Sequence, residues 1–302
     1  MEFLLTLLPP LLWASATLTD KMLVSGGGDD AKPGALMAIS GFFNLLFGTA
    51  IILPLLSATG GIRVLASLDA ATVLPLLLNG ATQTAAMILF LRAITLEEVS
   101  RVDPWFQTIP AFGIVLAYGV IGERLVWYQW GAIVLLAVGG WVIKSEGAAS
   151  WRVVLYMVAA SFLLALNDTI FARFGREVGG GLWPAIFCDV MGKAVCGLVL
   201  LLGPRTRRGF VVGLRTKFRL QTVSEVLFIA ADFLFDRAKL LAPVAIVQGI
   251  ACSQPVFTLL GAALLTRLAP RLIREEQGIA FWRKFGGIAL IVAGGAVLAT
   301  TR

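Results

Sequence analysis

Acidic and basic side chains interrupt the long apolar stretches of this chain, and one pair has helical spacing. Asp189 and Lys193 stand four residues apart. Side chains at that spacing lie one above the other on a helix, so their charges can neutralise each other. Inside a bilayer this matters, because a charge there costs about 2.5 to 3.5 kcal/mol even on insertion scales. We interpret the two residues as a structural ion pair, with contact to a substrate as the alternative.

Three other aspartates, Asp168, Asp232 and Asp236, lie in similar stretches. Asp232 and Asp236 are one helical turn apart, and two carboxylates on one face in a low dielectric do not both ionise easily. This spacing predicts that one of them carries a proton. Asp168, with no cation near it in the sequence, is the third candidate for proton coupling. In the alternative, Asp236 pairs with Arg237 or Lys239, and the Asp232 carboxylate has no partner.

Several kinds of enzymatic chemistry have no support in the sequence. The chain contains no histidine, which removes metalloprotease motifs and catalysis by a histidine base. It also lacks a Walker A motif, so nothing in it indicates an ATP-driven pump. We therefore expect no enzymatic activity, no cofactor and no metal site.

Composition indicates that membrane helices position these residues. Hydrophobic residues make up 58% of the chain, charged residues 14%, and the mean hydropathy is +0.88. A helix needs about 20 apolar residues to cross the hydrocarbon. Ten such runs can be marked, at 3–19, 35–57, 71–91, 104–121, 125–143, 151–171, 182–203, 223–240, 243–265 and 283–301. The predicted fold class is all-α integral membrane, with ten transmembrane helices.

The sequence contains an internal repeat that includes two prolines. Residues 90–112 agree with residues 235–257 at 8 of 23 positions, where chance in an apolar chain gives about two. Pro110 and Pro255 are among the matched residues. Proline frees a backbone carbonyl one turn earlier, and membranes tolerate this where the carbonyl faces protein or a water-filled cavity. We predict helix breaks at both prolines.

The repeat divides the chain into two units, residues 1–148 and 149–302, with five predicted spans each. Because five is odd, the second unit must enter the membrane in the opposite sense to the first. The fold is therefore predicted to consist of two inverted five-helix repeats. Such repeats place a binding site near the membrane midplane, at the interface between the units, and let it open to each side in turn.

The residues around Pro110 resemble a known family. Glu98-Val99-Ser100-Arg101-Val102-Asp103-Pro104, followed by Pro110, Gly122-Glu123-Arg124-Leu125 and Gly139-Gly140, is similar to the EamA-type branch of the drug/metabolite transporter superfamily. Leu12-Trp13-Ala14-Ser15 is similar to that family's first helix. The resemblance covers nearly the full length and implies transport of small molecules, commonly export, without ATP. The second unit departs from it, with Leu265-Thr266-Arg267 where the first has Gly122-Glu123.

The resemblance also implies a central cavity among predicted spans one, three, four, six, eight and nine, and polar or aromatic side chains cluster on these spans. The residues predicted to contact a substrate are Trp13, Asn79, Gln83, Trp105, Gln107, Asn167, Asp168, Asp232, Phe233, Gln248 and Gln254. Taken singly, each is explained equally well by an interhelical hydrogen bond or ordinary packing. Their joint placement on matching spans indicates a binding cavity more strongly than any single residue does.

Basic residues predict the orientation and the contacts with lipid. The side that holds both termini has 7 Lys and Arg residues and the other side has 17, so the positive-inside rule places both termini outside. The resemblance implies the opposite orientation. The excess lies mainly in two predicted loops, 204–219 and 267–284. Contact of these loops with anionic headgroups accounts for the net charge of +7 without nucleic acid.

Predicted spans five and ten carry small residues seven positions apart. These are Ala132 with Gly139 and Gly287 with Gly294. Small side chains let another helix approach closely. Contacts within one chain are favoured, and a homodimer seam is the alternative.

These observations predict a transporter of the inner membrane that exports a small organic metabolite or drug-like solute by alternating access, with proton exchange as the coupling. A lipid-carrier or headgroup flippase of the same fold is the first alternative. A membrane interaction protein that transports nothing is the second, and it is favoured if large apolar side chains seal the cavity.

Overall fold

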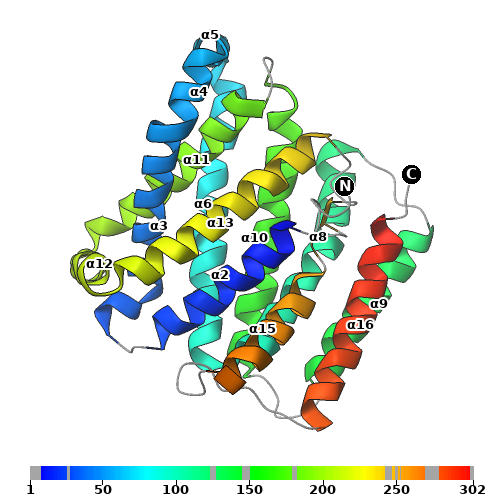
Figure 1. The fold of residues 1–302 in the computed structure, drawn as a ribbon. Helices are drawn as coiled ribbons and strands as arrows, with labels where there is room; N and C mark the ends of the chain where they lie inside the picture. The colour runs from blue at the N-terminus through cyan, green and yellow to red at the C-terminus, as the bar shows by residue number, and fades with distance from the viewer. Residues whose placement is uncertain are drawn as a thin grey trace.

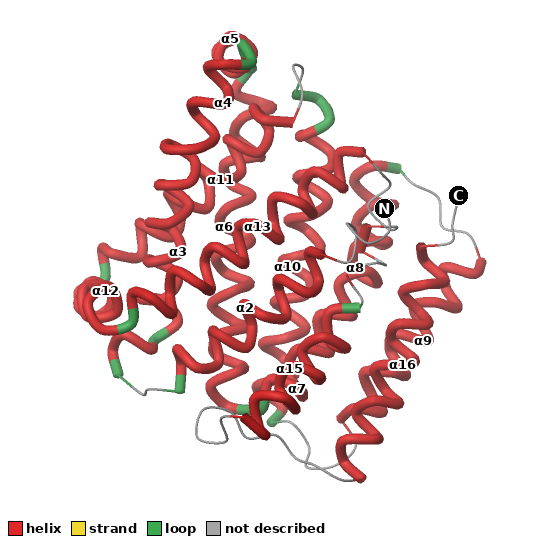
Figure 2. The backbone as a smooth tube through the Cα atoms, viewed as in Figure 1, coloured by secondary structure: helices red, strands yellow, loops and turns green. Residues whose placement is uncertain are grey.

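The computed structural model describes residues 8–25, 28–122, 127–144, 150–178, 182–241, 247–248, 251, 253–268 and 279–299. Every regular element in these ranges is helical (Figure 2). The all-α prediction is therefore confirmed for the part of the chain that is described.

Each long helix overlaps one of the apolar runs predicted from the sequence, although the bounds differ by up to about ten residues. They are α2 (Leu8–Val24), α3 (Pro33–Phe47), α6 (Ala70–Leu96), α9 (Trp127–Lys144), α10 (Trp151–Gly175), α11 (Leu182–Val199), α13 (Phe218–Leu241), α15 (Gln254–Leu268) and α16 (Ile279–Ala299). Shorter elements are η1 (Asp29–Ala31), η2 (Gly48–Ile52), α4 (Leu53–Ala58), α5 (Gly61–Ser67), α7 (Val99–Val102), η3 (Asp103–Thr108), α8 (Ile109–Leu116), η4 (Ala117–Ile121), η5 (Leu200–Leu202) and α12 (Pro204–Thr216).

Four helical stretches are long and apolar enough to cross a membrane. They are Pro33–Ala58, Ala70–Leu96, Trp151–Gly175 and Leu182–Leu202. A multi-pass membrane protein is thus supported by length and composition. The count of ten spans, the inverted repeat and the boundary between residues 148 and 149 remain predictions.

The fourth predicted span is divided into several short helical pieces. A single turn of α7 runs into the 3-10 helix η3, which begins at Asp103, and α8 then begins at Ile109. Pro110 is the second residue of α8, and Pro255 is the second residue of α15. The missing N–H of proline is harmless at such a position, because the first N–H groups of a helix have no intrahelical acceptor. Both repeated prolines therefore mark the beginnings of α-helices.

Pairs of glycines bring α11 close to two other helices. A side chain at Gly80 of α6 would overlap the backbone of Gly192 in α11, and a side chain at Gly41 of α3 would overlap Gly197. Small residues permit this approach of membrane helices. Helix α6 also packs against α10, and α2 packs against α13 and α15. These contacts gather helices from both predicted units around one centre (Figure 1).

Helices α9 and α16 pack side by side at one edge of the bundle (Figure 1). The small residues at 132, 139, 287 and 294 are buried in this pair. The favoured interpretation of these residues, a contact within one chain, therefore matches their place in the fold. The homodimer remains a prediction.

The predicted basic loop 204–219 is largely helical, which corrects its description as a loop. Helix α12 packs on α3 and η1 with Gly209 and Gly213 buried. Its exposed side includes Arg205, Arg207, Arg208 and Arg215, together with Val211 and Val212. The glycines let α12 pack closely on α3 and η1, and the arginines lie on its exposed side. Most of loop 267–284 lies outside the described residues, although Ile279–Lys284 begin α16.

Candidate functional site

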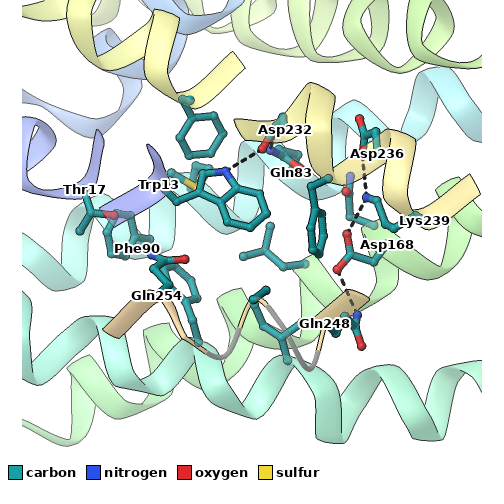
Figure 3. A pocket seen from close by; sticks show the side chains of 18 of the residues that line it. Trp13, Thr17, Gln83, Phe90, Asp168, Asp232, Asp236, Lys239, Gln248 and Gln254 are labelled. Atoms are coloured by element: carbon teal, nitrogen blue, oxygen red, sulfur yellow. Dashed lines mark hydrogen bonds and ion pairs between the residues drawn. The ribbon is translucent and has the colours of Figure 1, made fainter. Parts of the chain in front are cut away.

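A cavity of about 100 Å³ lies among α2, α6, α8, α10, α11, α13 and α15. Its lining combines charged groups with aromatic rings (Figure 3). The residues predicted from the sequence that line it are Trp13, Gln83, Pro110, Asn167, Asp168, Lys193, Asp232, Asp236, Gln248 and Gln254. Residues far apart in the chain are thus brought to one cavity. Large apolar side chains, among them Met87, Phe106 and Leu164, also line it.

Asp232 accepts hydrogen bonds from three other helices. Trp13 Nε1 donates to Oδ1 at 3.0 Å. Gln83 Nε2 and Lys193 Nζ both donate to Oδ2, each at 2.9 Å. Two of these donors are neutral and the third is an ammonium group, and hydrogen bonds that involve charged groups are the stronger ones. The carboxylate therefore ties α2, α6, α11 and α13 together at the wall of the cavity (Figure 3).

Lys193 is shared between two carboxylates. Its Nζ lies 2.8 Å from Asp189 Oδ2 and 2.9 Å from Asp232 Oδ2. Asn79 Nδ2 also donates to Asp189, at 2.9 Å. The sequence spacing indicated the contact within α11, and the structure adds a second carboxylate from α13. Asp232 is therefore not left without a partner, as one interpretation of the sequence had it.

Lys239 forms a second cluster of the same kind. Its Nζ lies 2.8 Å from Asp168 Oδ1 and 2.7 Å from Asp236 Oδ1. Gln248 Nε2 donates to the other oxygen of Asp168 at 3.0 Å. The ammonium also lies 4.9 Å from the ring centroid of Phe235, where the face of the ring attracts a cation. Of the two interpretations of Asp236, the pairing with Lys239 is the one that occurs (Figure 3).

Three of the remaining predicted residues, Asn79, Trp105 and Phe233, are not part of the cavity lining. Asn79 is fully buried, and its carbonyl accepts a hydrogen bond from Asn167 Nδ2 at 3.0 Å. Trp105 packs against the apolar cluster that contains Phe90. Phe233 stacks on Trp183 with ring centroids 5.4 Å apart. For these three, the packing interpretation describes the structure better than substrate contact. The side chain of Gln107 lies outside the described residues.

Sequence reasoning missed most of the aromatic wall. Phe90, Phe106, Phe228 and Phe235 line the cavity. A signal was present for two of them, because Phe90 and Phe235 are the first matched pair of the internal repeat. Aromatic residues are so common in membrane helices that their type alone does not distinguish a cavity wall from ordinary packing.

A second, smaller cavity of about 40 Å³ adjoins the first. The two share Gln83, Met87, Lys193, Phe228 and Asp232 in their linings. The second cavity also contains two carboxylates that the sequence analysis did not single out. Ser224 Oγ donates to Asp20 at 2.5 Å, and Gln221 Nε2 donates to Glu225 at 3.2 Å. The Asp232 side chain thus contributes to the lining of both cavities.

Comparison with known proteins supports the resemblance seen in the sequence. Residues 1–145 match the model of the EamA-like transporter family. No curated protein matches the chain. A solved structure titled "Crystal structure of protein" is 16% identical, covers 97% of this chain and 94% of its own, and has a TM-score of 0.60. At that identity the likeness shows the fold alone.

Proposed function

We propose that this chain, a member of the drug/metabolite transporter superfamily through its EamA-like residues 1–145, is a secondary transporter that exports a small organic solute by alternating access. The observation that carries the proposal is the cavity with two lysine-aspartate clusters. Buried charges in membrane helices are costly and are retained mainly for function. A cavity that groups them with aromatic rings suits the binding of a polar solute.

The lining indicates the chemical class of the solute. Three aspartates and two lysines line the cavity, so the lining has a formal excess of one negative charge. The aromatic rings beside them attract cations through their faces. We therefore favour a small solute with a positive or zwitterionic amino group and an apolar part.

The size of the cavity supports the same choice. Pockets for drug-sized ligands have volumes of about 300 to 1,000 Å³, whereas this cavity has about 100 Å³. A solute of a few heavy atoms fits this conformation. A larger one requires the helices to move apart, and the hydrogen bonds of Asp232 must then be broken or replaced by bonds to the solute.

Coupling to protons is part of the proposal, with Asp232, Asp236 and Asp168 as the aspartates suggested by the sequence. Each has a lysine partner within 2.9 Å. A proton can bind one of them only if the lysine contact weakens at the same time.

The location follows from the same family membership and from the surface charges. We propose a bacterial-type inner membrane, with the arginines of α12 and those of loop 267–284 against anionic headgroups on the cytoplasmic side. Both termini then lie outside.

The experiment compares small amines and amino acids inside and outside cells that lack or overproduce the protein, at two external pH values. Export predicts that overproduction lowers the internal level of at least one solute and raises its external level. The variant Asp232→Asn should lose this difference, and Asp69→Asn, at an exposed helix cap, should keep it. A shift of fluorescent lipid analogues with no shift of any small solute would instead support the flippase alternative.

A further inference from the structure

Asp103, at the start of η3, is a buried carboxyl group with an incomplete set of hydrogen bonds. The residue has no exposed surface. Gln254 Nε2 donates to Asp103 Oδ1 at 2.8 Å. The other oxygen, Oδ2, has no hydrogen-bond partner in the described structure. An ionised carboxylate can accept several hydrogen bonds on its two oxygens. With one donor on Oδ1 and none on Oδ2, the surroundings of Asp103 stabilise a negative charge poorly.

Among the residues that the structure describes, the groups around Asp103 do not compensate a negative charge. The side chains that act on its carboxyl group are Gln254 and Thr258 of α15, and both are neutral. Arg101, on the neighbouring α7, lies 3.5 Å from Glu98 and 3.7 Å from Glu97. On α10, which also packs against η3, Asp168 is held by Lys239. Among the described residues Asp103 therefore differs from the cavity aspartates, each of which has a lysine.

The hydroxyl group of Thr258 can serve either form of Asp103. Thr258 Oγ1 donates to the Gln254 carbonyl oxygen at 3.3 Å, a long hydrogen bond for a hydroxyl group. When it turns toward Asp103, it can donate to an ionised carboxylate or accept from a protonated one. An unpaired buried charge costs several kcal/mol. A protonated Asp103 avoids that cost, because it carries no charge and its O–H can donate to Thr258.

We propose that Asp103 is a neutral acid in this conformation and that it, rather than the lysine-paired Asp168, Asp232 or Asp236, binds and releases the coupled proton. This inference rests on the proposed transport function. The proton is taken from water on one side of the membrane and returned to water on the other, and no covalent bond between heavy atoms changes. Release leaves a carboxylate that requires water, so it favours a conformation in which the site is hydrated.

The position of Asp103 explains how its charge can affect the cavity. Its partner Gln254 lines the cavity. With Asp103 ionised, the Gln254 amide must donate to it. With Asp103 protonated, the amide is free to turn and present either its oxygen or its N–H groups to a solute. Residues 103 and 254 also belong to the two predicted units, so the contact joins them where they are expected to move against each other.

An infrared measurement tests the neutral acid directly. The purified protein at neutral pH should show the carbonyl band of a protonated carboxylic acid, and Asp103→Asn should lack one component of it. Other buried acids cancel in the difference between the two spectra. Asp69→Asn removes an exposed carboxyl group and keeps a good helix cap, so its spectrum should match the wild type. Identical spectra for wild type and Asp103→Asn would overturn the inference.

A transport measurement tests the coupling. Vesicles containing the protein are loaded with a defined mixture of small amines and amino acids under an imposed pH difference. If one proton exchanges for one solute, the limiting concentration ratio changes about tenfold per pH unit. Asp103→Asn should make this ratio independent of pH while exchange of solute for solute persists.

The outcomes separate this inference from the proposed function. A wild type that exports solute with no dependence on pH overturns the role of Asp103 and leaves transport standing. The same holds if Asp103→Asn keeps the wild-type pH dependence. A wild type that moves no solute overturns both proposals. Thermal unfolding of Asp103→Asn in detergent shows whether the variant is folded.

Discussion

Lys193 of α11 lies 2.9 Å from Asp232 of α13. Its ammonium group neutralises a carboxylate that also accepts hydrogen bonds from Trp13 of α2 and Gln83 of α6. Asp189, one turn from Lys193, shares the same ammonium group. Such sharing stabilises the cluster in a membrane interior, because each charged group lowers the free energy cost of burying the others. The cluster therefore has a structural role and also forms one wall of the cavity.

The first prediction concerns the stability of this cluster. Lys193→Met leaves the buried Asp189 and the partly buried Asp232 without their cation, and should lower the free energy of unfolding by about 3 to 5 kcal/mol. Thermal unfolding of the purified protein in detergent measures the effect. Lys32→Met is the matched control, because the Lys32 side chain is 54% exposed beside Asp29 and its removal should change little. Adding Asp189→Asn and Asp232→Asn to Lys193→Met should restore part of the loss. If the single variant unfolds like the wild type, the ion cluster is not structural.

The second prediction concerns the indole of Trp13. Trp13→Phe keeps an aromatic ring but removes the donor to Asp232, and a hydrogen bond to a charged group contributes about 1.5 to 3 kcal/mol. We expect the affinity for the exported solute to change by about tenfold or more, measured as the solute concentration that gives half-maximal efflux. Trp127→Phe, at a side chain that is 81% exposed, is the control. Equal affinities for both variants would show that the Trp13 donor does not organise the site.

The third prediction concerns the close approach of α6 and α11. Gly80→Ala places a methyl group against the backbone of Gly192, and overpacking of this kind costs about 1 to 3 kcal/mol. Gly131→Ala is a matched control, because a side chain there meets open space. Unfolding in detergent should show the first variant destabilised and the second unchanged. If Gly80→Ala were as stable as the wild type, the two helices would be farther apart than described.

The fourth prediction concerns orientation. Reporter fusions after Arg302 and within residues 204–219 should report opposite sides of the membrane, with the α12 segment in the cytoplasm. Replacing the four exposed arginines of α12 with glutamine should weaken this preference. A cytoplasmic reporter after Arg302 would show that the loop charges do not decide the orientation.

Sequence reasoning identified residues within each helix better than contacts between helices. The four-residue spacing of Asp189 and Lys193 is visible in the sequence because it lies on one helix. The contact of Lys239 with Asp168 joins residues 71 positions apart, and helical periodicity contains no information on which helices are neighbours. For the same reason, the sequence does not mark Asp103 as a site residue. Its burial and its hydrogen bond with Gln254 depend on contacts with another helix.

Sequence alone suffices for the helical class, the membrane setting, the repeated prolines and most of the polar residues that reach the cavity. Hydropathy and internal similarity report these properties directly, since each depends on local composition or on comparison along the chain. Helix packing sets which carboxylate has a lysine and which aromatic rings form the wall. It also buries Asp103 with one oxygen unpartnered in the described structure. Those outcomes depend on the packing of helices distant in sequence, where small residues such as Gly80 and Gly192 set the distance.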